Sequence, residues 1–282
     1  MKQLPTGGIL GKVQRLYRFV HDLHIPLHAA NASYFIMLAA FPLLVLLLSI
    51  VRYTGLEIGS LLEVLSGVVP VALMPALERV VLSLYRNSST TMVSVSAVVA
   101  LWAASQGIHG MLKGLYNIYG VPEIRGGIVT RLISVVYTFA FVIVLVLTLV
   151  LHVFGTTMLG WLQESEQPLL RFLMDVIDLR FILLLVLQTA LFTAMFMAIP
   201  NQLNSFGCSL PGAVLAAGGW HLFSYGFTVY VDRFGDMAGL YGPVYTLAMG
   251  MLWLYFCMSI LFYGGTLNAW LIAWKERRSQ ED

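Results

Sequence analysis

Residues 29 to 51 read AANASYFIMLAAFPLLVLLLSIV, a stretch without any charged side chain. A helix needs about 20 mostly apolar residues to cross the hydrocarbon core of a bilayer. Five later stretches meet the same requirement, at about 91–112, 128–154, 181–199, 210–231 and 243–274. Because these runs are too long and too continuous for barrel strands, only helices can satisfy their backbone groups in lipid. The sequence predicts an all-α polytopic membrane protein whose six transmembrane helices form one domain over residues 29–274.

The composition excludes a soluble globular protein. Hydrophobic residues make up 59% of the 282-residue chain and charged residues 11%, whereas an ordinary soluble domain has about 25% charged residues. The formal net charge of +2 is too balanced for a nucleic-acid-binding surface, which requires a strongly basic patch. The two cysteines, Cys208 and Cys257, cannot form a disulfide framework. We therefore expect membrane lipids as partners and no nucleic acid.

The distribution of Lys and Arg predicts the orientation of the chain. If the N-terminus lies in the cytoplasm, ten of the 16 Lys and Arg residues fall on the cytoplasmic side, and cytoplasmic loops normally carry this excess. Six spans return the C-terminus to the same side. We expect a cytoplasmic amphipathic segment at residues 1–28 and a charged cytoplasmic tail at residues 275–282.

Two further stretches have the pattern of helices that lie on a membrane surface. Residues 9–24 place apolar side chains on one helix face and Lys or Arg elsewhere, as in a cationic amphipathic helix on the cytoplasmic leaflet. Residues 56–86 carry two short apolar stripes separated by Pro70 and Pro75. Each stripe is too short to span a bilayer, so we predict two short interfacial helices on the outer surface; a re-entrant pair is the alternative.

Polar side chains share one face of the fifth predicted helix. His221, Ser224 and Tyr225 are three or four residues apart, a spacing that places them on one side of a helix. His221 falls near the middle of the membrane, and because imidazole titrates near neutral pH it suits a ligand, lipid-headgroup or proton site. The alternative is a neutral imidazole that is hydrogen-bonded to a neighbouring helix.

Three other predicted helices carry polar residues towards their cytoplasmic ends. Together these residues predict a polar recess that opens to the cytoplasm, because polar side chains inside a membrane tend to face the bundle interior. The alternative is hydrogen bonding between helices without a cavity. The candidate substrate-binding residues are His221, Tyr225, Ser224, Tyr255, Trp102, Gln106, His109, Asn31 and Asn268.

The sequence lacks the common signatures of catalytic and metal sites. It contains no HExxH, Walker A or GxSxG motif, and its acidic residues are scattered. His21, His24 and His28 share a helix face, but we expect Pro26 to interrupt that helix, and no acid or Cys completes a metal site. We therefore expect no enzymatic activity, no catalytic residues, no metal and no cofactor.

Residues 101–125, which read LWAASQGIHGMLKGLYNIYGVPEIR, resemble the signature of the YihY/BrkB family of bacterial inner-membrane proteins. The order of Pro211, Trp220 and Trp253 follows the same family pattern, and the segment from Gly264 to Ala269 resembles the GAELN ending of the family. Thr266 stands where that ending has an acid. A role of that acid is therefore not carried over to this chain.

This resemblance implies a multi-pass protein of the bacterial inner membrane with six helices and without an agreed activity. An old family label, ribonuclease BN, describes a tRNA-processing enzyme. The scattered acids and His residues of this sequence cannot assemble a metal-dependent nuclease site, which indicates that the label is misassigned. Some relatives are linked to virulence, serum resistance and the handling of envelope lipids.

The leading functional hypothesis is a non-enzymatic protein that binds or translocates a lipid-like or amphiphilic envelope substrate. In this hypothesis His221 is the central contact, Tyr225 and Tyr255 line the path, and the cytoplasmic mouth lies near Trp102, Gln106 and Asn268. The alternative is a non-transporting envelope scaffold or assembly protein, with a homo-oligomer or an envelope protein as its partner, in which the polar stripes only join helices. A remote alternative is a tRNA-processing ribonuclease.

Overall fold

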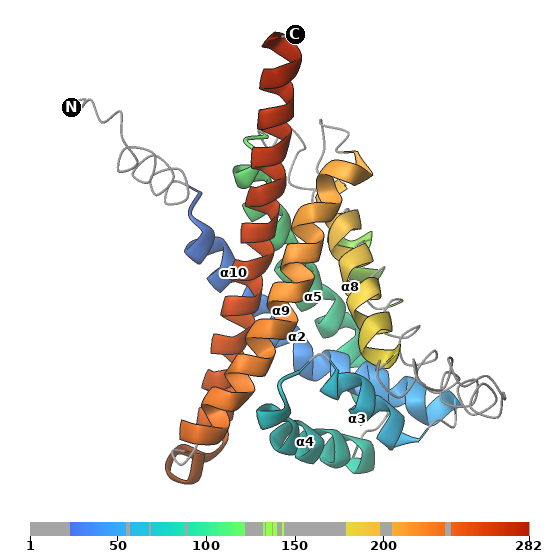
Figure 1. Cartoon of the computed structure of the whole chain (residues 1–282). Helices are drawn as coiled ribbons and strands as arrows, with labels where there is room; N and C mark the ends of the chain where they lie inside the picture. Colours follow the sequence, from blue (N-terminus) through green and yellow to red (C-terminus); the bar gives the residue numbers. More distant parts are fainter. Residues whose placement is uncertain are drawn as a thin grey trace, which may run out of the picture.

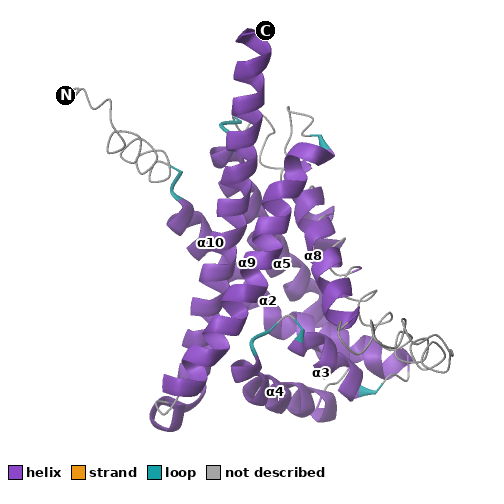
Figure 2. Cartoon of the chain, viewed as in Figure 1, coloured by secondary structure: helices purple, strands orange, loops and turns teal. Residues whose placement is uncertain are grey.

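The computed structural model describes residues 23–54, 57–67, 69–87, 90–121, 179–197, 205–234 and 238–281, together with seven separate positions between 132 and 143. Every regular element in these ranges is a helix (Figures 1 and 2). The elements are α2 (Ile25–Thr54), α3 (Ile58–Ser66), the short 3-10 helix η1 (Val71–Leu73), α4 (Met74–Asn87), α5 (Thr90–Ile118), α8 (Leu179–Met197), α9 (Phe206–Phe234) and α10 (Ala238–Glu281).

Within the described ranges, three helices are long and apolar enough to cross a membrane. They contain the apolar stretches Ile25–Ser49, Ser94–Ile118 and Val244–Lys275, which correspond to the first, second and sixth predicted spans. α8 and α9 occupy the fourth and fifth, and the apolar stretch of α8 is shorter. The third predicted span, 128–154, lies outside the described residues except at the separate positions named above. Six spans therefore stay a prediction.

The first helix begins earlier than predicted. α2 starts at Ile25, so residues 25–28 belong to the first helix and not to the N-terminal segment. The expected interruption near Pro26 is present, because His24 lies in a turn with a backbone φ of 49° and the helix begins at Ile25. Pro26 itself lies in the first turn of α2, where its missing N–H has no intrahelical partner to lose. The predicted helix at 9–24 lies outside the described residues except for its last two, which form a turn.

The last helix ends later than predicted. α10 runs for 44 residues and reaches Glu281, because neither Gly nor Pro follows Gly265 to end it. The predicted charged tail at 275–282 is therefore a continuation of this helix through Glu281. Whether this end lies in the cytoplasm stays a prediction.

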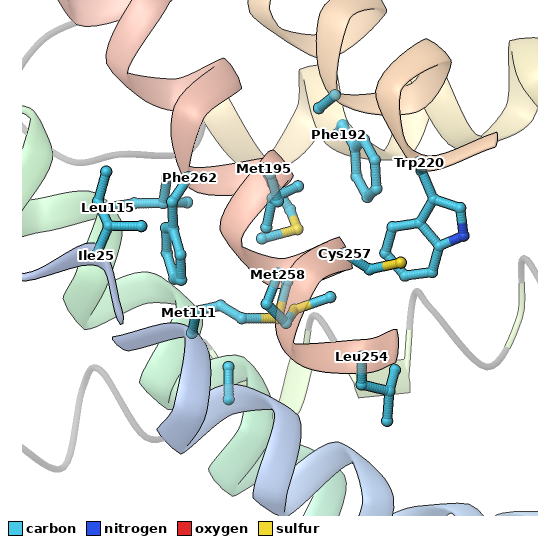
Figure 3. Close-up of a cluster of buried hydrophobic side chains, with 14 of the residues drawn as sticks. Ile25, Met111, Leu115, Phe192, Met195, Trp220, Leu254, Cys257, Met258 and Phe262 are labelled. Atoms are coloured by element: carbon cyan, nitrogen blue, oxygen red, sulfur yellow. The ribbon is translucent and has the colours of Figure 1, made fainter. Parts of the chain in front are cut away.

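The five long helices form one bundle. α2 packs chiefly against α5 and α10, and α9 packs against α8 and α10. Side chains from all five meet in a buried cluster that includes Leu115, Phe192 and Phe262 (Figure 3). Lipid tails are as apolar as these side chains, so burial alone does little to hold membrane helices together. Close packing and polar contacts between helices must therefore decide the arrangement.

α3 and α4 form a separate layer at the end of the bundle that lies away from the C-terminus (Figure 1). Leu61 of α3 and Val81 of α4 are buried in a second apolar cluster with Val45 and Val51 of α2, while Glu78 of α4 is exposed. The two short helices predicted within 56–86 are present. Their place on the outer membrane surface stays a prediction.

Candidate functional site

Asn268 connects α10 to the backbone of α9. Its side chain is fully buried. The Asn268 Oδ1 atom accepts a hydrogen bond from the Gly212 N–H at 2.7 Å, and Nδ2 donates one to the Ser209 carbonyl at 2.9 Å. Pro211 lies between these two positions inside α9 and cannot donate to the preceding turn. The Asn268 amide therefore bonds the α9 backbone at the point where a proline weakens its own hydrogen bonding.

The two helices touch through glycines beside this amide. A Cβ atom added to Gly212 would collide with the Gly264 carbonyl oxygen, and one added to Gly264 would lie 2.5 Å from the Gly212 carbonyl oxygen. Small residues allow such close approach of membrane helices. Asn268 thus belongs to a helix–helix contact, and this finding favours the interhelical alternative for that residue.

Two buried hydroxyl groups belong to residues that lie beside Asn268. The Tyr119 hydroxyl comes close to Asn268 without reaching hydrogen-bond geometry, and burial raises the pKa of this phenol. The Ser209 hydroxyl is also buried and has no hydrogen-bond partner among the described residues. Tyr119 is not among the substrate-binding candidates because it follows the apolar run of its span. The one feature of the sequence that points to Tyr119 is its position in the stretch 101–125, which resembles the family signature.

The polar residues of α9 that were predicted to share one face point in two different directions. The Ser224 Oγ atom accepts a hydrogen bond from Trp253 Nε1 at 3.0 Å, so Ser224 faces α10. Tyr225 is 73% exposed and faces away from the bundle. The expected single interior face is therefore wrong for Tyr225, because this residue lies about 140° around the helix from the buried Trp220.

His221 lies at the edge of the buried face of α9. Its ring packs edge-on against Phe181 of α8, with 5.0 Å between ring centroids. The side chain is partly buried. Its Nε2 atom is buried without a hydrogen-bond partner among the residues that the structure describes. An imidazole nitrogen in this state is costly in a low-dielectric environment.

The remaining candidates lie at other contacts. Asn31 occupies the space beside Gly110, whose added Cβ would meet the Asn31 side chain at 2.7 Å. Trp102 is 48% exposed and lies edge-on to Phe35, with ring centroids 6.3 Å apart. Gln106 and His109 on α5 and Tyr255 on α10 are partly buried. The structure thus does not gather the candidates at one site: Asn31 lies at the α2–α5 contact, His221 at the α8–α9 contact, Ser224 and Asn268 at the α9–α10 contact, and Tyr225 on the outer face of α9.

A pocket of about 380 Å³ opens elsewhere, where α2 begins and α5 ends. None of the predicted substrate-binding residues lines it. The lining residues are His24, Leu27, His28, Lys113, Tyr116, Asn117 and Val121.

The structure also locates two of the three histidines considered for a metal site. His24 precedes α2 with a backbone φ of 49°, whereas His28 lies in the helix. His21 is outside the described residues. In the part of the chain that the structure describes, no three His, Cys, Asp or Glu side chains are placed to hold one ion.

Comparison with known proteins identifies the family. A family model described as "Virulence factor BrkB" matches residues 16–282. The chain belongs to the BrkB family. The predicted resemblance is confirmed, and this BrkB protein is an integral membrane protein, in agreement with a bacterial inner-membrane location.

Two curated relatives align with most of this BrkB chain. The ribonuclease-like protein YfkH of Bacillus subtilis is 29% identical over 243 residues, which are 86% of this chain and 88% of the relative. The UPF0761 membrane protein VV0203 of Vibrio vulnificus is 26% identical over 293 residues, which cover 100% of this chain and 88% of the relative. No solved structure matches the chain.

Proposed function

We propose that this BrkB protein has six membrane spans with both termini in the cytoplasm, and that it binds or translocates a lipid-like, amphiphilic envelope substrate without catalysing a reaction. The family and the membrane location are established above. The substrate class is inferred from the surface of α9.

The observation that carries the proposal is the position of His221. It lies near the middle of the 29-residue helix α9, and its buried Nε2 has no hydrogen-bond partner among the described residues. Polar groups at this depth in a membrane are costly and usually serve a function. A hydroxyl or headgroup oxygen of an amphiphile would supply the missing partner.

Tyr225 belongs to the same surface of α9 as His221. It lies one helical turn after His221 and therefore on the same side of α9. Tyr225 and the neighbouring Leu222 are each 73% exposed. Together they form an accessible face that has both apolar and hydrogen-bonding character. An amphiphile could contact this face from the surrounding lipid without entering a closed channel.

The scaffold function is the second candidate, and the α9–α10 contact favours it. Asn268 and Ser224 both use their polar atoms on the partner helix. If all polar positions act in this way, substitutions would change stability and leave lipid binding unaffected.

Native mass spectrometry of the gently extracted full-length protein tests the proposal. We expect a specific lipid class to remain bound, and His221→Leu to reduce its retention about threefold to tenfold, because one hydrogen bond is lost at nearly constant side-chain volume. Leu252→Ala, at an exposed position of α10 outside this face of α9, is the matched control and should retain the lipid. Unchanged retention in His221→Leu, with folding intact, would exclude this role for His221. The same spectra report bound nucleic acid, which the ribonuclease alternative requires, and the number of subunits.

A further inference from the structure

The pocket between α2 and α5 lies at the level where two apolar spans end. His24 immediately precedes the stretch Ile25–Ser49, and Asn117 and Val121 lie at the end of the stretch Ser94–Ile118. Lipid headgroups occupy this level of a bilayer. The pocket of about 380 Å³ is large enough for a headgroup.

Hydrogen bonds hold the walls of this pocket in place. The Asn117 amide donates to the Leu23 carbonyl at 2.8 Å, across 94 residues of sequence. Gly120 follows the end of α5 at Ile118, and its φ of 64° suits a glycine cap. The Val121 N–H donates to the Tyr116 carbonyl at 3.0 Å. These contacts fix the end of α5 against the beginning of α2, so the pocket exists before a ligand binds.

Glycine brings the two walls together beneath the pocket. A Cβ atom added to Gly114 of α5 would lie 2.9 Å from the Cβ atom of His28 on α2. The α5 backbone therefore approaches α2 at the point where His28 projects. Lys113, the residue before Gly114 in α5, is exposed and lines the same pocket.

The polar lining favours an anion. His24, His28 and Lys113 all line the pocket, and none of the described lining residues is acidic. His28 lies within electrostatic reach of both other groups. An ammonium and imidazole N–H groups are donors that suit phosphate oxygens. An anion in the pocket would accept hydrogen bonds from the Lys113 ammonium and from imidazole N–H groups.

An apolar stripe continues from the pocket along α2. Leu27 lines the pocket and is 67% exposed. Tyr34, Leu38 and Phe41 follow it on one face of the helix and are also exposed. Free phosphate would use only the cationic end of this surface, whereas a phospholipid would use both the pocket and the stripe.

We propose that the pocket lined by His24, His28 and Lys113 binds the phosphate group of a membrane lipid, whose acyl chain lies along the Leu27–Phe41 face of α2. This inference rests on the proposed function and adds to it a headgroup class and a second contact site, at the end of α2 rather than at His221. It differs from the substrate site predicted from sequence, since none of the nine candidate substrate-binding residues lines the pocket.

The test uses the full-length protein in nanodiscs that contain phosphatidylglycerol and diacylglycerol, with bound lipids measured by native mass spectrometry. We expect wild type to retain phosphatidylglycerol in preference to diacylglycerol. Lys113→Gln should lower this retention about fivefold, the effect of one cation near a membrane surface. Lys113→Arg should preserve it. Lys275→Gln is the matched control, because Lys275 is also exposed at the end of an apolar span and does not line the pocket.

Further arms of the experiment separate the ligand sources. Leu27→Ser should lower lipid retention without changing the binding of inorganic phosphate, since only the lipid uses the stripe. If inorganic phosphate binds in a Lys113-dependent manner while phosphatidylglycerol retention does not depend on Lys113 or Leu27, the pocket holds free phosphate and the lipid assignment is overturned. Equal losses in Lys113→Gln and Lys275→Gln would show only general attraction to an anionic surface, which also overturns the site.

The result also distinguishes this inference from the proposed function. If His221→Leu reduces lipid retention and Lys113→Gln does not, the protein handles an amphiphile but the headgroup site is wrong. If neither variant changes lipid retention, both proposals fail.

Discussion

Asn268 shows how a single polar side chain can serve packing in a membrane protein. The sequence places an amide near the end of the last helix, where it could equally contact substrate or another helix. In the structure, both polar atoms of the Asn268 side chain form hydrogen bonds with the α9 backbone, at residues 56 and 59 positions away in sequence. Because the residue has no exposed surface, its contribution is to stability and helix register.

We predict that Asn268→Leu destabilises the protein by about 2–4 kcal/mol, because the Gly212 N–H and the Ser209 carbonyl both lose a buried partner. Thermal or denaturant unfolding in detergent measures this change. Thr266→Val is the control: the Thr266 hydroxyl donates only within its own helix, to the Phe262 carbonyl. A loss below about 0.5 kcal/mol in Asn268→Leu would mean that lipid or water replaces the amide.

At the scale of elements, glycines decide which helix faces meet. α5 approaches α2 at Gly107 and Gly110, and α9 approaches α10 at Gly212. Other glycines of the same helix have open space around them, as Gly218 does. The residue type alone therefore does not identify a contact; its neighbours in the folded protein do.

We predict that Gly212→Ala destabilises the α9–α10 pair by about 1–3 kcal/mol, because the new methyl group meets the rigid backbone of α10 rather than a movable side chain. Gly218→Ala, in the same helix, should be neutral or stabilising by up to about 1 kcal/mol, since alanine favours the helix and an added Cβ there meets nothing within 4 Å. Unfolding measurements on the two variants compare them directly. Equal effects would show that helix propensity, not contact, controls both sites.

At the scale of the whole molecule, the layer of α3 and α4 gives the bundle two unlike ends. One end carries this layer and the other carries the C-terminus and the α2–α5 pocket (Figure 1). The excess of Lys and Arg predicts that the C-terminal end faces the cytoplasm. This would place the pocket on the cytoplasmic leaflet and α3 and α4 outside.

We predict that Glu78→Cys, on the exposed face of α4, reacts with a membrane-impermeant maleimide added to intact spheroplasts. Lys275→Cys should react only after permeabilisation, because the distribution of Lys and Arg predicts that α10 ends in the cytoplasm. The native Cys208 and Cys257 are replaced by Ser and Ala in the background. The reverse labelling pattern would invert the topology and move the pocket to the outer leaflet.

The amino-acid sequence alone is sufficient to identify a helical membrane protein, because uncharged stretches of bilayer length can satisfy their backbone only as helices. It also identifies the family, through the stretch at 101–125.

The tertiary structure, in contrast, decides which side of each helix faces a neighbouring helix. Lipid and protein interior are both apolar, so hydrophobic periodicity cannot separate the two faces. Tyr225 therefore points outward although its spacing from His221 suggested the interior. The pocket brings His24 and Lys113 together, and the hydrogen bond from the Asn117 amide to the Leu23 carbonyl, across 94 residues of sequence, holds its walls. Only the folded chain creates this proximity.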